Sequence, residues 1–92
     1  MPSRKPKKKS IKLKLNGKHY LSDNVREAME AYFVDLDGQD AGDLYDLFIE
    51  QVEIPLFETV MNNAEGNITK ASDILGMNRG TLRTRLKKYG LY

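Results

Sequence analysis

The sequence of 92 residues predicts an all-α fold of four helices that ends in a helix-turn-helix. In its central part, apolar residues recur at the i, i+3, i+4 and i+7 spacing of amphipathic helices. Near the C-terminus, two short segments each begin at a residue that commonly caps helices, and a Gly-containing turn joins them. Two short helices connected in this way form the helix-turn-helix unit of many DNA-binding proteins.

The segment 1–20 predicts a basic arm in front of a globular part, 21–92. Residues 1–10 contain no apolar side chain besides Met1 and two prolines, which is typical of a disordered segment. Alternating Leu and Lys residues before Asn16-Gly17 predict a β-hairpin with a two-residue turn, in which Leu13 pairs with Tyr20. Because a lone hairpin is only marginally stable in water, we expect the arm to be mobile.

The first long helix should begin near residues 22–24, because Ser, Asp and Asn are preferred N-caps. Asn24 and Glu27 form a plausible variant of the capping box. Apolar residues from Val25 to Leu36 then fall on one face, and Gly38 is expected to end the helix.

The second long helix is predicted over 43–64. Its apolar positions form three rows instead of one stripe, so a single copy of the first helix cannot cover them. We therefore expect a homodimer held by this helix. Pro55 removes one backbone hydrogen bond, and it predicts a kink rather than a break because the apolar spacing continues on both sides. The expected interface residues are Leu44, Leu47, Phe48, Val52 and Leu56.

The helix-turn-helix is predicted over about 68–75 and about 79–89. Asn67 or Thr69 caps its first helix, Asn78 caps the second, and a glycine allows the tight turn between them. The residues expected to face inward are Ala71, Ile74, Leu75, Met77, Leu82 and Leu86.

The net charge of +2 conceals an uneven distribution along the chain. Residues 1–21 carry eight Lys or Arg and no acid, residues 22–66 carry one base and twelve acids, and residues 67–92 carry six bases and one acid. Two basic ends flanking an acidic middle indicate that the ends face a polyanion. Ordinary solvated charged faces are the alternative explanation.

The exposed side of the last helix has the chemistry of a recognition helix. Arg bonds guanine edges in a bidentate manner, whereas hydroxyls and further cations bind phosphates. Because the N-terminal end of such a helix points at the bases, we expect base contacts from Asn78, Arg79 and Arg83. The side displays Arg79, Thr81, Arg83, Thr84, Arg85, Lys87 and Lys88, and the preceding helix should place Asn67, Thr69 and Lys70 near phosphates. An ordinary basic amphipathic helix is the competing interpretation.

The composition argues against several other classes of protein. Without cysteine and with one histidine, His19, the sequence predicts no metal site, no cofactor and no catalytic dyad, so we do not expect an enzyme. No apolar run is long enough for a membrane span, and the N-terminus is too charged for a secretory signal. The expected location is the cytosol, and a purely structural dimerisation module would leave the basic helix unexplained.

Three segments, LDGQDAGDLYDL, EIPLFETVM and GNITKASDILGMNRGTLRTRLKKYG, resemble the Fis family of nucleoid-associated bacterial proteins. The resemblance covers about 21–92. It implies an intertwined homodimer of four-helix subunits whose second helices cross, with dimerisation over about 21–65 and the helix-turn-helix over about 66–92. It also implies binding to degenerate A·T-rich double-stranded DNA, bending of that DNA, regulation of transcription and a location in the bacterial nucleoid.

The resemblance also assigns roles to individual residues. Asn78 and Arg79 stand where the family contacts base edges, with Arg79 on a guanine near each end of the site. Thr84 stands where the family commonly has Lys. The expected phosphate contacts are Asn67, Thr69, Lys70, Thr81, Arg83, Thr84, Arg85 and Lys87.

Further partners and one alternative follow from the same comparison. Family arms contact a site-specific recombinase, and RNA polymerase is a second candidate partner. Here the arm is lysine-rich, which departs from the family pattern, so an arm that contacts phosphate or has no structure is at least as well supported. The closest alternative function is that of a detached DNA-binding output domain from an NtrC-type enhancer-binding activator.

Overall fold

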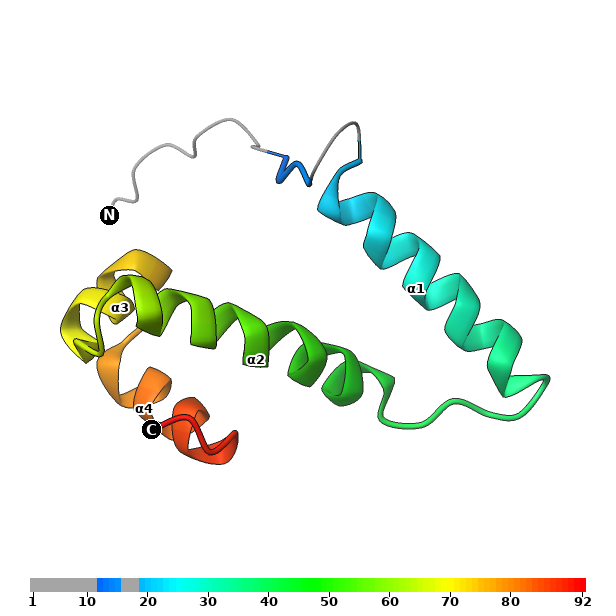
Figure 1. Ribbon diagram of the computed structural model, residues 1–92. Coiled ribbons are helices and arrows are strands. Elements are labelled where there is room, and N and C mark those ends of the chain that lie inside the picture. Colours follow the sequence, from blue (N-terminus) through cyan, green and yellow to red (C-terminus); the bar gives the residue numbers. More distant parts are fainter. Residues whose placement is uncertain (1–11, 16–18) are drawn as a thin grey trace, which may run out of the picture. The chain divides into compact units, whose positions relative to one another are not determined.

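A computed structural model of the protein describes residues 12–15 and 19–92. Four helices account for most of this part: α1 (Leu21–Leu36), α2 (Leu44–Asn63), α3 (Ile68–Leu75) and α4 (Arg79–Lys88) (Figure 1). The all-α prediction is confirmed. Residues 1–10, the expected disordered segment, and Asn16-Gly17, the expected turn, lie outside the described residues.

The chain divides into two compact units, Met1–Gly42 and Asp43–Tyr92. The second unit combines α2 with the two short helices, so the helix that is expected to form the dimer and the helix-turn-helix belong to one body. The functional division near residue 65 remains a prediction. No helix in the described part of the chain combines the length and apolarity needed to cross a membrane.

The predicted hairpin register is wrong by one residue. Lys14, not Leu13, lies opposite Tyr20, flanked by hydrogen bonds from Leu15 N to His19 O and from Leu21 N to Leu13 O, both 2.8 Å. A one-residue slip moves a side chain to the other face of a strand. In this register the Nζ atoms of Lys12 and Lys14 lie 5.5 and 5.8 Å from the centroid of the Tyr20 ring. These cation–π contacts favour the observed pairing of the two segments.

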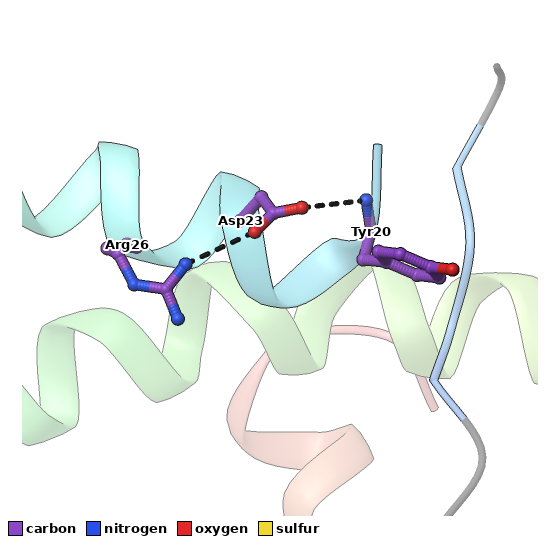
Figure 2. A network of polar contacts seen from close by, with 3 residues as sticks. All are labelled: Tyr20, Asp23 and Arg26. Atoms are coloured by element: carbon purple, nitrogen blue, oxygen red, sulfur yellow. Dashed lines mark hydrogen bonds and ion pairs between the residues drawn. The ribbon is translucent and has the colours of Figure 1, made fainter. Parts of the chain in front are cut away.

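Helix α1 begins earlier than expected, at Leu21, with Tyr20 as its N-cap. Figure 2 shows the contacts that explain this start. The Asp23 carboxylate accepts a hydrogen bond from Tyr20 N at 3.2 Å, and it forms an ion pair with Arg26, whose Nη1 atom lies 3.1 Å away. An acidic residue at the third helical position satisfies the N-cap N–H and interacts favourably with the helix dipole. The capping box predicted at Asn24 is therefore wrong, because Asn24 lies inside the helix. At the other end Asp37 and Gly38 both adopt positive φ.

Helix α2 runs without interruption through Pro55, so the competing interpretation of a break is excluded. Its bounds agree with the prediction, with Asp43 and Ala64 as the caps. The core of the second unit lies against its C-terminal half and consists of Phe57, Ala64, Ala71, Leu82 and Leu86, all nearly inaccessible to solvent. Ile74 was expected to face inward but is 51% exposed, and the buried neighbour on α3 is Ser72.

Candidate nucleic-acid interface

The two short helices begin where the sequence predicts because an asparagine caps each of them, and α4 ends one residue before the expected position. The Oδ1 atom of Asn67 accepts a 3.1 Å hydrogen bond from Lys70 N at the start of α3. The Oδ1 atom of Asn78 accepts bonds of 2.7 Å from Gly80 N and 3.3 Å from Thr81 N at the start of α4. These bonds satisfy N–H groups that have no partner within the helix.

The turn between the helices is a Schellman motif centred on Gly76, which has a φ of 71°. The N–H of Met77 donates to Ser72 O at 3.0 Å, and the N–H of Gly76 donates to Asp73 O at 3.3 Å. An L side chain is disfavoured at this φ, so glycine permits the tight reversal. The motif therefore sets the direction in which α4 leaves α3.

Helix α4 has one buried stripe and one exposed polar side. Leu82 and Leu86 are fully buried, and Tyr89 at the C-cap is partly buried. The exposed residues of the helix are Arg79, Gly80, Thr81, Thr84, Lys87 and Lys88, whereas Arg83 and Arg85 are half-buried. The predicted inward stripe is confirmed at Leu82 and Leu86. The exposed side presents cations and hydroxyls.

Two polar contacts organise the exposed side near the start of α4. The Nη1 atom of Arg79 donates a 3.3 Å hydrogen bond to Thr69 Oγ1, so residues from both short helices meet there. The Thr84 hydroxyl donates to Gly80 O at 3.0 Å, one turn back in the same helix. A Cβ atom on Gly80 would lie 3.1 Å from the capping oxygen of Asn78, so a larger residue at position 80 would require the cap to shift by a few tenths of an ångström.

The last turn of α4 carries two lysines against aromatic rings. Lys87 Nζ lies 5.4 Å from the centroid of the Tyr92 ring, and Lys88 Nζ lies 5.5 Å from that of Tyr89. A ring face attracts a cation without supplying a negative charge, so both ammonium groups can still form an ion pair with another partner.

Arg85 differs from the other cations of α4. Its Nη1 atom lies 2.5 Å from Glu53 Oε2 on α2, and the Tyr89 hydroxyl donates a 2.7 Å hydrogen bond to Glu53 Oε1. The hydrogen bond to the Glu53 carboxylate, aided by partial desolvation, raises the pKa of Tyr89 to about 12. Sequence analysis missed Glu53. Its one signal is that it precedes the buried Phe57 by four residues and therefore lies on the same face of α2.

The structure brings some of the predicted residues together and leaves others separate. Thr69 and Arg79 are in contact, and Asn67 and Lys70 occupy the first turn of α3 close to them in sequence. Asn78 caps the N-terminus of α4, and Thr81 and Lys87 are exposed along the helix. Within the described part of the chain, Arg85 is the predicted site residue that forms an ion pair with an acidic side chain.

Comparison with known proteins places this arrangement in a family. The family model described as "Bacterial regulatory protein, Fis family" matches residues 48–89. A Fis-like DNA-binding protein of Pseudomonas aeruginosa is 54% identical over 71 residues, which cover 77% of this chain and 68% of that protein. The DNA-binding protein Fis of Proteus mirabilis is 51% identical and that of Haemophilus influenzae 49%, each over 77% of this chain and 72% of the relative.

Proposed function

This chain belongs to the Fis family of bacterial regulatory proteins, and from that membership we propose that it is a homodimeric, nucleoid-associated protein that binds and bends double-stranded DNA. The observation that carries the proposal is the exposed side of α4, where Arg79, Thr81 and Lys87 follow a capped helix N-terminus. No catalytic role is proposed.

Base contacts are assigned to Asn78 and Arg79. The N-terminal end of a recognition helix approaches base edges, and both residues stand at that end of α4. Arg79 is exposed and its one hydrogen-bond partner among the described residues is neutral, the Thr69 hydroxyl. A guanidinium held in this way keeps donors for the O6 and N7 atoms of guanine.

Phosphate contacts surround these two residues. The exposed first turn of α3 supplies cations and hydroxyls on one side, and the rest of α4 supplies them on the other. The proposed contacts are Asn67, Thr69, Lys70, Thr81, Arg83, Thr84 and Lys87. Arg85 belongs to the same set only when its ion pair with Glu53 opens, since a guanidinium bound to a carboxylate has less charge to offer.

Support for the proposed dimer comes from apolar side chains that the contacts within each of the two units leave exposed. No residue of α1 is buried. On α2, Val52 is 39% exposed and Leu56 is 42% exposed, and both lie on the row that continues through Phe48 and Leu44 at four-residue spacing. Leu47 beside this row is also exposed. We infer that a second chain covers this row, because a helix that is apolar on several sides must be covered on several sides.

Bending and regulation belong to the same proposal. Two helix-turn-helix units set closer together than one turn of B-form DNA bend the duplex, and A·T-rich sequences deform at lower cost. The protein would act in the bacterial cytoplasm on the nucleoid, regulating transcription and, through its arm, stimulating a site-specific recombinase.

RNA polymerase is a further proposed partner. The detached output domain of an NtrC-type activator is less well supported, because similarity to proteins named Fis extends over 71 residues, beyond the segment 48–89.

A circular-permutation gel shift on A·T-rich duplexes at two salt concentrations tests the proposal. We expect a complex with two chains per duplex, mobility that depends on the position of the site, and weaker binding at the higher salt concentration. Binding without any positional effect on mobility would remove bending from the proposal. Absence of binding at the lower salt concentration would refute the proposal as a whole.

A further inference from the structure

Both carboxylate oxygens of Glu53 are bound, one by a residue of α4 and the other by the C-cap of that helix. Arg85 Nη1 lies 2.5 Å from Oε2, and the Tyr89 hydroxyl lies 2.7 Å from Oε1. The Glu53 side chain is only 16% exposed, and one turn further along α2 the buried ring of Phe57 lies 6.3 Å from the ring of Tyr89, measured between centroids. The carboxylate is therefore held in a packed position beside α4.

This arrangement singles out one cation of the proposed DNA-binding side. Among the described residues, Arg85 is the one side chain of α4 in an ion pair. The Nζ atoms of Lys87 and Lys88 lie over aromatic rings, and Arg79 donates a hydrogen bond to a hydroxyl. Arg85 is 40% exposed, so solvent and phosphate can reach its guanidinium once the ion pair opens.

A carboxylate and a DNA phosphate compete for the same guanidinium, since both bind it through charge-assisted hydrogen bonds. We propose that Glu53 withholds Arg85 from DNA phosphates and acts as a specificity determinant that lowers sequence-independent affinity. This inference rests on the proposed DNA-binding function. Phosphate contacts supply essentially all non-specific binding, so removing one contact per subunit weakens binding to unrelated sequences while the base contacts at Asn78 and Arg79 remain.

The salt dependence of binding counts the phosphate contacts and so tests the inference. The full chain is titrated onto a mixed-sequence duplex at salt concentrations from about 50 to about 200 mM, and log Kd is plotted against log salt. In the wild-type background Arg85→Ala should leave the slope unchanged. Glu53→Gln keeps the size of the side chain and an acceptor for Tyr89, but it should steepen the slope by about 0.9 per subunit, which is about a tenfold greater loss of affinity over that range for a dimer.

The double variant Glu53→Gln with Arg85→Ala should return to the wild-type slope, because the added contact is Arg85 itself. Glu58→Gln is the matched control, since Glu58 is an exposed acid on the same helix and forms no ion pair among the described residues. Tyr89→Phe is the second control, because it removes the hydrogen bond to Glu53 and leaves the ion pair.

Two results would overturn the inference. One is a slope that falls by about 0.9 per subunit in Arg85→Ala, because Arg85 would then already contact phosphate in the wild type. The other is a change in Glu53→Gln no larger than that in Glu58→Gln. If Glu53→Gln does not fold, as judged by circular dichroism, the Arg85→Ala slope decides alone. Failure of the proposed function has a different signature, the absence of wild-type binding at the lowest salt concentration.

Discussion

The Tyr89 hydroxyl donates a 2.7 Å hydrogen bond to Oε1 of Glu53, and this bond joins the C-cap of α4 to the middle of α2. The same carboxylate binds Arg85, so the end of the proposed recognition helix is fixed to the helix that is proposed to form the dimer. The orientation of α4 therefore depends on contacts with a residue of α2.

We expect this bond to make stability depend on alkaline pH. The pKa of Tyr89 rises from 10.0 to about 12 in the folded protein, so the contribution is fully present below pH 10.0 and is lost as the pH rises through about 12. Tyr89→Phe removes it. The difference in unfolding free energy between wild type and variant, measured by urea titration, should shrink between these two pH values. If the difference in unfolding free energy stays constant across this pH interval, the pKa of Tyr89 is not raised in the folded state.

Asn78 is expected to affect stability and DNA binding separately. Asn78→Ala removes the acceptor for Gly80 N and Thr81 N and should lower the unfolding free energy by about 0.5–2 kcal/mol. Asn78→Asp keeps the acceptor and adds a charge that the helix N-terminus favours, so stability should be retained. Its affinity for DNA should nevertheless fall, because the added charge repels phosphate. Equal destabilisation of the two variants in thermal unfolding would contradict the capping role.

Arg79→Ala is expected to weaken binding by about 1–3 kcal/mol and to abolish the preference for guanine near the ends of the site. The test compares duplexes that differ only at that base pair. Lys87→Ala is the matched control, because an exposed phosphate contact should weaken both duplexes alike. If Arg79→Ala also weakens both alike, Arg79 contacts phosphate and not a base.

Val52→Asp is expected to abolish the dimer, since it places a charge in the uncovered apolar row of α2. Sedimentation of the wild type at micromolar concentration should show two chains, and the variant should lose both the dimer and its cooperative unfolding. Gln51→Asp adds the same charge at the adjacent exposed polar position and should remain dimeric. A well-folded wild-type monomer in this experiment would refute the proposed assembly.

The elements whose limits depend on local chemistry could be predicted from the sequence. Helices α3 and α4 begin where Asn67 and Asn78 cap them, and the turn between them needs the positive φ of Gly76. The continuity of α2 through Pro55 followed from the apolar spacing on both sides. In each case residues within one or two turns of each other decide the outcome, so the sequence alone contains the cause.

The features that sequence analysis missed depend on contacts between residues that no periodic pattern relates. The ion pair of Glu53 and Arg85 joins residues 32 positions apart. The hairpin register depends on which side chains meet the Tyr20 ring, and turn preference alone favoured a different pairing. Ile74 has the spacing of an inward residue, but α3 is too short for spacing to distinguish its buried side from its flank.

The cap at the start of α4 also limits what Asn78 can recognise. An asparagine that reads adenine in a bidentate manner needs its oxygen and its amide nitrogen together. Here the oxygen is bonded to Gly80 N and Thr81 N, so only the amide hydrogens remain for a base. Guanine, adenine and thymine all present an acceptor in the major groove. If Asn78 contacts a base as proposed, it would reject little more than cytosine while the helix keeps its cap, and a loosely defined target sequence would result.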